Sequence, residues 1–153
     1  SCCNFVGNRR GICPKGWHVP TVEEWNQMES YVNGSTVDDS TTNYVGTLAG
    51  ELSKGGNWSG TSSLDYPNRP NTYADENRNS SGFGAVPAGY TQYSSGYVFA
   101  GAGTAACFWT ATKYPTDNTY RYVRKLQNDK EGVKNSYDQQ TNQYSVRCVR
   151  DSE

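Results

Sequence analysis

The residues that could carry out catalysis are few and widely spaced in this sequence. His18 is the only histidine among 153 residues, and it lies two positions before Pro20. No nucleophile elbow, phosphate-binding loop or His-Glu-x-x-His motif occurs, and the sequence does not match His18 with a nucleophile such as Cys13 or Ser63. We therefore expect no enzymatic activity and assign His18 a structural role.

Five cysteines stand at positions 2, 3, 13, 107 and 148. They form no Cys-x-x-Cys pair and share the chain with one histidine, so a structural zinc site is disfavoured. An odd number of cysteines allows many disulfide pairings. The wide separation of Cys13 and Cys148 favours a bond that joins the two ends, with Cys107 paired to Cys2 or Cys3. Buried free thiols in a reducing compartment are the alternative.

Acidic residues occur in groups that could hold a hard cation. These are Asp38-Asp39, Asp75-Glu76 and the acids at positions 117, 129 and 131. Asp117, Asn118, Asn128 and Asp129 form the strongest subset, because two turns of adjacent strands could converge there. Such groups are usually solvated loop charges. We expect no cofactor and no metal, with a bound calcium ion as the alternative.

Residues 113–144 have the composition of a recognition surface, because Tyr, Asn, Asp and Ser dominate them. Tyrosine offers a large flat contact with one polar tip, and Asn and Ser adapt their hydrogen bonds to a partner. A solvated hairpin with tyrosines paired across its strands is the alternative interpretation. The predicted ligand contacts are Tyr114, Asp117, Asn118, Tyr120, Tyr122, Lys125, Asn128, Asp129, Asn135 and Tyr137.

Charge and hydropathy exclude two classes of partner. Fourteen basic and fifteen acidic residues give a formal net charge of -1, so no basic surface for nucleic acid is expected. No apolar run is long enough to span a bilayer, and the N-terminal residues do not show the charged, then apolar, then small-residue pattern of a leader. Aromatic residues make up 13% of the chain and must supply much of a small core.

The predicted elements place helices before strands. Thr21 and Glu24 form a capping box, and Asn33-Gly34 supplies a stop signal, so we expect a helix near residues 21–33. Apolar spacing predicts a second helix at 44–54. Residues 55–81 are predicted to form a long surface loop anchored by Trp58. Strands are predicted at Phe83–Tyr90, Tyr97–Ala100, Ala106–Thr112, Tyr120–Gln127 and Gln143–Arg150. This order indicates a single α+β domain.

Four ordered blocks resemble the Fibrobacter succinogenes major paralogous domain, a family of secreted and surface proteins abundant in Bacteroidetes and Fibrobacteres. The blocks are Gly11-Ile12-Cys13-Pro14-Lys15-Gly16-Trp17-His18-Val19-Pro20-Thr21 with Glu24-Trp25, Gly82-Phe83 with Ala85-Val86-Pro87-Ala88-Gly89-Tyr90, Phe108-Trp109-Thr110-Ala111-Thr112, and Ser145-Val146-Arg147-Cys148-Val149-Arg150-Asp151. Together they extend from residue 11 to residue 151.

The resemblance implies a C-type-lectin-like fold, with two helices in the N-terminal half and a small antiparallel sheet in the C-terminal half. Formylglycine-generating enzymes and the variable proteins of diversity-generating retroelements use the same architecture. In such folds the two chain ends lie together, which agrees with a bond between Cys13 and Cys148. The family usually carries a further N-terminal part, so residues 1–153 resemble one domain that lacks part of that segment.

The departures from related proteins limit what the resemblance implies. The Glu-Pro-Asn or Gln-Pro-Asp loop and the Trp-Asn-Asp strand of calcium-dependent lectins are missing. The pair of active cysteines of formylglycine-generating enzymes is also missing, since Cys107 stands in a different motif. The resemblance therefore implies the scaffold, while function resides in the loops.

These observations favour a non-enzymatic binding or adhesion module, exposed at the bacterial cell surface or secreted, that recognises a glycan or protein ligand. One alternative is a structural subunit of a surface appendage or envelope layer, suggested by the odd cysteine. An enzyme related to the formylglycine generators, using Cys107, is a third hypothesis. Nucleic acid and a membrane-spanning role are not expected, and attachment to a larger surface assembly fits either of the first two hypotheses.

Overall fold

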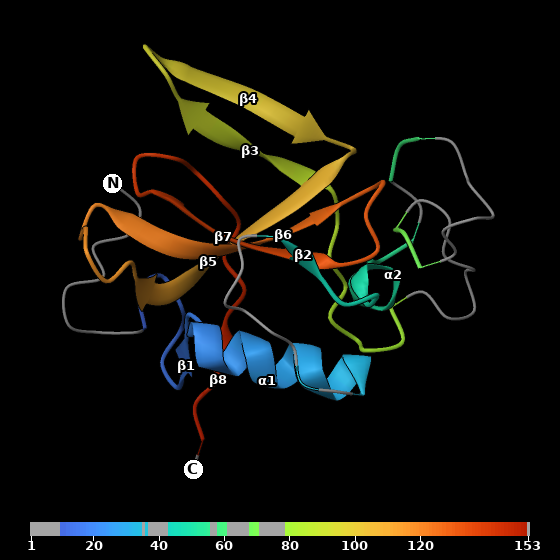
Figure 1. Cartoon of the computed structure of the whole chain (residues 1–153). Helices are drawn as coiled ribbons and strands as arrows, with labels where there is room; N and C mark the ends of the chain where they lie inside the picture. Colours follow the sequence, from blue (N-terminus) through green and yellow to red (C-terminus); the bar gives the residue numbers. More distant parts are fainter. Residues whose placement is uncertain are drawn as a thin grey trace.

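The computed structural model describes residues 10–34, 36, 43–55, 58–60, 68–70 and 79–152. Both α-helices and β-strands are present, and most of the elements are strands (Figure 1). In chain order the elements are β1 (Trp17–His18), α1 (Val22–Asn33), β2 (Tyr44–Val45), α2 (Ala49–Leu52), β3 (Ala88–Tyr93), β4 (Tyr97–Ala102), β5 (Ala105–Lys113), β6 (Tyr120–Gln127), β7 (Val133–Gln139) and β8 (Val149–Arg150).

The main sheet is larger than the small C-terminal antiparallel sheet that we expected. It has six strands in the order β2-β7-β6-β5-β3-β4, and β2 comes from the N-terminal half. The sheet is mixed, because β3 meets β5 in parallel through the single pair Gly89↔Ala106. All other neighbouring strands in it pair antiparallel. A second, two-stranded sheet joins β1 to β8.

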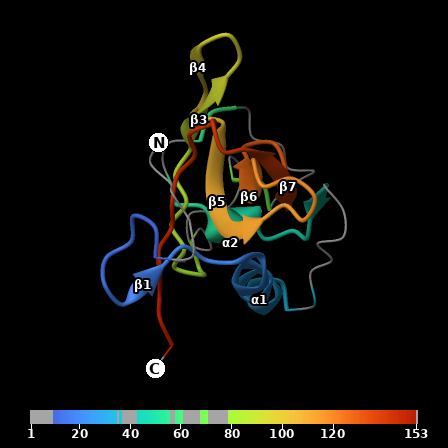
Figure 2. The ribbon, with the colours of Figure 1, turned by 90° about the vertical axis from the view of Figure 1, so that its left-hand side faces the viewer.

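Helix α1 confirms the prediction from the capping signals. The Thr21 side chain accepts a hydrogen bond from the Glu24 backbone N–H at 3.2 Å, and the Glu24 carboxylate accepts one from the Thr21 N–H at 2.8 Å. These two bonds satisfy N–H groups that the first turn of a helix leaves unpaired. Gly34 ends the helix in the left-handed conformation at φ 70°. The helix covers one face of the sheet (Figure 2).

The second predicted helix was largely wrong. Residues 44–45 form strand β2 against β7, and only Ala49–Leu52 are helical. Gly46 at φ 73° separates the two, which is a backbone conformation that no helix can include. The apolar spacing arose because Leu48, Ala49 and Leu52 are all buried, although most of the segment is not helical.

Strand β6 has the predicted bounds, whereas other strands differ. Strand β7 was missed inside the recognition stretch because it is mostly polar. The predicted strand Gln143–Arg150 is reduced to β8, with isolated bridges at Gln143 and Ser145. The strand predicted at Phe83–Tyr90 begins only at Ala88.

The core lies between the helices and the α1 face of the sheet. The aromatic rings of Trp25, Phe83 and Phe108 contact one another with centroid separations of 5.2–5.7 Å. Leu126 and Val133 complete the sheet side, and both are fully buried. Trp58 packs against this cluster and donates its indole N–H to the Lys54 carbonyl, which fits its predicted anchoring role.

The disulfide between Cys13 and Cys148 is confirmed, with 5.8 Å between the two Cα atoms. Both residues pack in a small apolar cluster with Val19 and Val146. Strands β1 and β8 pair directly beside it. A covalent bond and a short sheet therefore hold together segments that are 135 residues apart.

Candidate binding surface

The ten predicted contact residues fall into two groups along β6. Tyr114, Asp117, Asn118, Tyr120, Tyr122 and Tyr137 gather where β6 begins and β7 ends. Lys125, Asn128, Asp129 and Asn135 lie toward the other end of β6. Because β6 has eight residues, its ends are separated by roughly 25 Å. The ten residues thus do not form one continuous surface.

Four tyrosines form the first group's centre, which we call the tyrosine cluster: Tyr114, Tyr120, Tyr122 and Tyr137. Tyr122 stands directly opposite Tyr137 in the β6–β7 register. The Tyr114 backbone N–H donates to the Tyr120 carbonyl, so Tyr114 lies beside the start of β6. Tyr114 stacks on Tyr137 with ring centroids 4.2 Å apart. Three segments of the chain thus contribute rings to one surface.

The tyrosine cluster is partly open to solvent. Tyr137 is 39% exposed, and the other three side chains are half-buried. A hydrogen bond with Tyr114 raises the pKa of the Tyr137 hydroxyl. The Gln139 amide donates to the Tyr120 hydroxyl at 2.9 Å. The rings are therefore held by one another, and the exposed part of the cluster can stack on a sugar ring or an apolar side chain.

A hydrogen-bonded turn with one acidic residue borders the cluster. Asp117 accepts hydrogen bonds from the Thr119 backbone N–H at 2.8 Å and from its hydroxyl at 2.7 Å. These bonds stabilise the ionised form and lower the pKa of the Asp117 carboxyl. Asn118 is exposed beside it, and its carbonyl accepts from the Gln140 amide. The turn supplies oxygen acceptors next to the aromatic rings.

The second group has structural contacts instead. Lys125 lies on the opposite face of the sheet, with its ammonium 4.8 Å from the centre of the Tyr90 ring. Asn128 binds the Ser59 carbonyl, and Asp129 pairs with Lys130 at 3.5 Å. Asn135 is only 3% exposed. We therefore leave these four residues out of the candidate surface.

The calcium site considered at Asp117, Asn118, Asn128 and Asp129 is contradicted by the topology. One pair precedes β6 and the other follows it, so the four side chains cannot share a cation. Within the described ranges, no group of three or more His, Cys, Asp or Glu residues could hold a metal ion. The pairs Asp38-Asp39 and Asp75-Glu76 lie outside the described residues.

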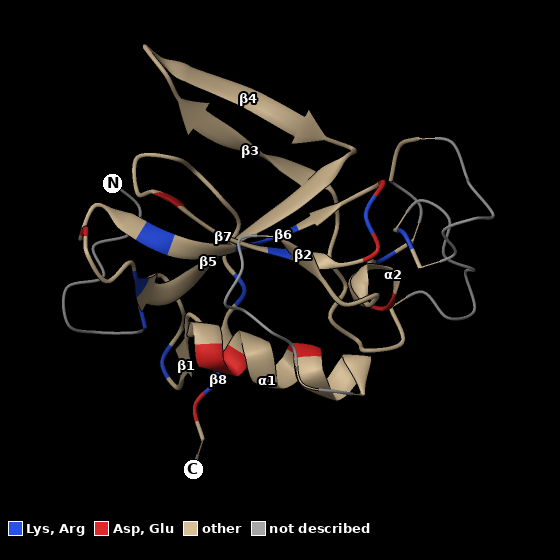
Figure 3. Ribbon diagram, in the orientation of Figure 1, with Lys and Arg blue, Asp and Glu red and all other residues tan. Residues whose placement is uncertain are grey.

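A second exposed surface was missed by the sequence analysis. Tyr93, Tyr97, Val98 and Phe99, all on the β3–β4 hairpin, are between 52% and 63% exposed. No charged residue occurs from position 79 to position 112, and Figure 3 shows the whole hairpin without charge. This long uncharged run was the available sequence signal, because exposed edge strands usually carry charged side chains.

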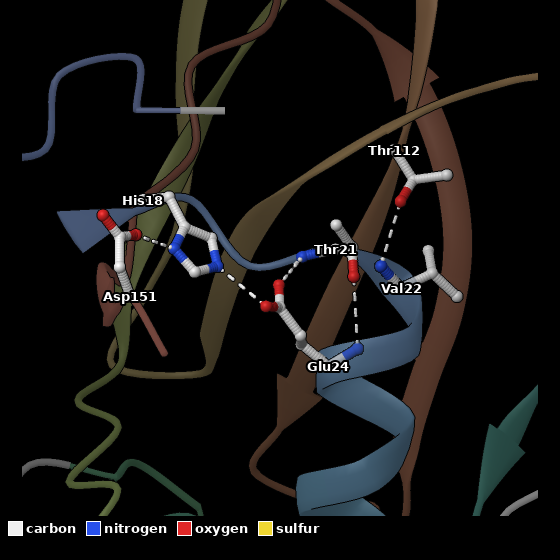
Figure 4. Close-up of polar contacts among 6 residues, drawn as sticks. All are labelled: His18, Thr21, Val22, Glu24, Thr112 and Asp151. Carbon is white, nitrogen blue, oxygen red and sulfur yellow. Dashed lines mark hydrogen bonds and ion pairs between the residues drawn. The ribbon is translucent and has the colours of Figure 1, made fainter. Parts of the chain in front are cut away.

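His18 is buried between two carboxylates (Figure 4). Its Nδ1 lies 2.5 Å from Asp151 and its Nε2 lies 2.8 Å from Glu24. Glu24 belongs to the capping box of α1, and Asp151 follows β8. His18 therefore ties the start of the helix to the end of the chain, which fits the structural role expected for it.

Cys107 is a free, buried thiol, so the expected pairing with Cys2 or Cys3 was wrong. Cys2 and Cys3 themselves lie outside the described residues. Burial raises the pKa of the Cys107 thiol to about 12. Thiolates are the reactive form of cysteine. A nucleophilic role for Cys107 is thus disfavoured at neutral pH.

A groove of about 300 Å³ runs beside α1, and it is mostly apolar. Trp25, Met28 and Phe83 line it, with Glu24 and Arg147 at its polar positions. Glu24 is engaged by His18 and Thr21, and Arg147 donates to the Phe83 carbonyl and lies over its ring. Ser81 also lines the groove and donates to the Glu51 carbonyl, and Tyr31 lines it with an exposed side chain. Most polar side chains of the groove are therefore engaged within the chain, whereas ligand sites usually direct several polar groups toward the ligand.

The fold combines α-helices with a mostly antiparallel sheet and is closed by a disulfide, and groups of exposed aromatic side chains lie at the tyrosine cluster and on the β3–β4 hairpin. The family model of the Fibrobacter succinogenes major domain matches residues 4–150, and the chain belongs to this family. Comparisons with curated proteins and with solved structures gave no match. None of the helices in the described ranges has the length and apolar character needed to cross a membrane.

Proposed function

We propose that the chain is a non-enzymatic binding or adhesion module, exposed at the bacterial cell surface or secreted, with a C-type-lectin-like fold. Its ligand is a glycan or a protein. The tyrosine cluster carries this proposal, because it combines partly exposed aromatic faces with the acceptors of Asp117 and Asn118. Stacking faces beside fixed oxygen atoms suit sugar rings and also the apolar side chains of a protein.

Two further observations support the proposal. The disulfide between Cys13 and Cys148 fits an oxidising compartment such as the cell exterior. The joined chain ends, through β1 and β8, fit the C-type-lectin-like architecture that the family resemblance implies. The disulfide cluster packs against Ala111 on β5, and the tyrosine cluster follows from Tyr114 onward, so the cross-linked segments lie at the end of β5 that leads into the cluster.

A glycan array and a surface-protein array, each probed with and without a chelator, test the proposal. Tyr137→Ala removes the most exposed ring of the cluster and should weaken binding at least about tenfold. Its ring contacts with Tyr114 and Tyr120 are together worth about 1–3 kcal/mol, so Tm should fall by less than about 12 °C. Tyr137→Phe keeps the ring and should retain binding if stacking dominates.

Tyr31→Ala is the matched control, because Tyr31 is 88% exposed on α1 and lies outside the cluster. It should bind as the unchanged chain does. Absence of any ligand on both arrays, or equal binding by Tyr137→Ala, contradicts the proposal. Binding that the chelator abolishes would show that a cation takes part.

The alternative function is a structural subunit of a surface appendage or envelope layer. The uncharged, exposed hairpin of β3 and β4 favours it, because such an edge can join other chains. Ladders of oligomers in native material from the cell surface would support this function over ligand recognition.

A further inference from the structure

The hairpin of β3 and β4 stands away from α1 and the core in both views of the fold (Figures 1 and 2). It is attached to β5 by the single pair Gly89↔Ala106, and Thr91 also exchanges two backbone hydrogen bonds with Gln143. Strand β4 forms the edge of the six-stranded sheet. Its outer side is therefore within reach of another molecule.

The backbone pattern shows which groups of β4 point outward. Thr91 bonds to Gln143, so its N–H and C=O point away from β4. Thr91 stands opposite Phe99, and in an antiparallel ladder such a pair directs the polar groups of both residues outward. The Tyr93 N–H donates to the Asn142 side chain, and Tyr93 stands opposite Tyr97. Tyr97 and Phe99 therefore present their N–H and C=O groups along the outer edge.

No hydrogen bond within the described ranges uses these outer groups of Tyr97 and Phe99. Gly101 limits the usable edge, because its φ is 73° and its carbonyl already accepts from Thr104. The free edge is thus centred on Val98. Natural proteins protect such edges with lysine, proline or bulges, and the segment from Tyr97 to Phe99 has neither charge nor proline.

We propose that β4 pairs with β4 of a second copy of this chain, antiparallel and about a twofold axis at Val98. In this register Tyr97 of one copy lies opposite Phe99 of the other, and the two residues exchange backbone hydrogen bonds. This occurs twice, so four backbone bonds form. Val98 faces Val98 of the other copy in the closer, non-hydrogen-bonded pair. The proposal goes beyond ligand recognition and leaves the tyrosine cluster uncovered.

Charge favours a second copy as the occupant of this edge. A surface that meets its own copy meets its own charges, so a like-charged edge repels itself. The hairpin lies in a segment without charged residues, from position 79 to position 112, and brings no such repulsion. The register is also self-complementary, because it places aromatic rings opposite aromatic rings.

The exposed area predicts a weak dimer. With about 200 Å² for each aromatic side chain, the exposed fractions of Tyr93, Tyr97 and Phe99 leave roughly 350 Å² per copy. Two copies could bury on the order of 700 Å², which is below the roughly 1,200 Å² of stable complexes. We expect a dissociation constant between about 10 µM and 1 mM. Dimerisation would place two tyrosine clusters on one particle and so strengthen adhesion through avidity.

Sedimentation equilibrium of the whole chain, from about 10 µM to 1 mM, tests the proposal. The unchanged chain should pass from monomer to dimer over this range. Val98→Lys and Val98→Glu each place like charges opposite one another, so each should weaken the dimer at least about tenfold. An equal mixture of the two variants should restore it, because the opposite charges then face each other.

Tyr31→Lys and Tyr31→Glu are the matched controls, since Tyr31 is exposed on α1, and both should dimerise normally. Circular dichroism and Tm verify that all variants fold. A chain that stays monomeric at about 1 mM overturns the proposal. Dimers of unchanged affinity in either Val98 variant also overturn it. Failure of the mixture to dimerise while each single variant is monomeric overturns the twofold register.

Discussion

Removal of the disulfide by Cys13→Ala with Cys148→Ala should lower the free energy of unfolding substantially. The bond spans 135 residues, and closing a loop of that length removes about 5 kcal/mol of chain entropy from the unfolded state at 25 °C. Measured effects of removing native disulfides are roughly 2–5 kcal/mol. For a chain of this size each kcal/mol corresponds to about 2–4 °C, so Tm should fall by roughly 5–20 °C.

Urea unfolding followed by tryptophan fluorescence measures this effect directly. The oxidised chain, the chain with reductant and the double variant should be compared under identical conditions. The reduced chain and the double variant should agree, and both should unfold with a larger m value, because their unfolded states expose more surface. Reductant should leave the double variant unchanged.

Cys107→Ala is the matched control, because it removes a cysteine without touching the bond. Reductant should destabilise it as much as it destabilises the unchanged chain. A loss below about 1 kcal/mol on reduction would refute the reasoning. In that case, the β1–β8 pairing and the His18 contacts would hold the ends together by themselves.

Two further predictions concern buried groups. In the folded chain, the Cys107 pKa of about 12 leaves about one thiolate in 10⁴ at pH 8. In urea, the ordinary pKa of 9.0 leaves about one in ten. Iodoacetamide should therefore alkylate Cys107 about 10³ times more slowly in the folded chain than in urea. The rate should rise tenfold per pH unit until pH 12; equal rates in both states would contradict this burial. Glu29→Gln removes one charge of the buried pair with Arg124, which spans 3.1 Å, and should cost roughly 3–5 kcal/mol in urea unfolding. Exposed Glu23→Gln is its control and should cost under about 1 kcal/mol, and a similarly small loss for Glu29→Gln would contradict the buried pair.

Local signals were sufficient for the elements that carry their own boundaries. Helix α1 was predictable because Thr21, Glu24 and Gly34 determine its ends through contacts within a few residues. Strand β6 was predictable because Tyr120, Tyr122 and Val123 favour strands and turn-forming residues stand on either side of the run. The disulfide between Cys13 and Cys148 followed from spacing and from the family resemblance.

Elements that depend on partners could not be predicted in this way. Strand β7 is polar on much of its surface, and it is a strand because β6 pairs with it. Strand β2 has only two residues and exists through the same neighbour. The register also decides the candidate surface. Tyr137 and Asn135 share one face of the sheet, but only Tyr137 is exposed. Asn135 is buried, and Arg124, which stands opposite it, pairs with Glu29 of α1. Helix α1 begins beside Thr112, because the Val22 N–H donates to the Thr112 hydroxyl. The tyrosine cluster starts at Tyr114, two residues after Thr112.

The position of the bond between Cys13 and Cys148 has a mechanical consequence. If tension is applied through the residues before Cys13 and after Cys148, the covalent link transmits the load directly from one segment to the other. The residues between the two cysteines are then bypassed and cannot be stretched out while the link is intact. After reduction, the more than one hundred residues between the two cysteines would bear the load and could be extended. The short β1–β8 pairing would be the first contact to separate.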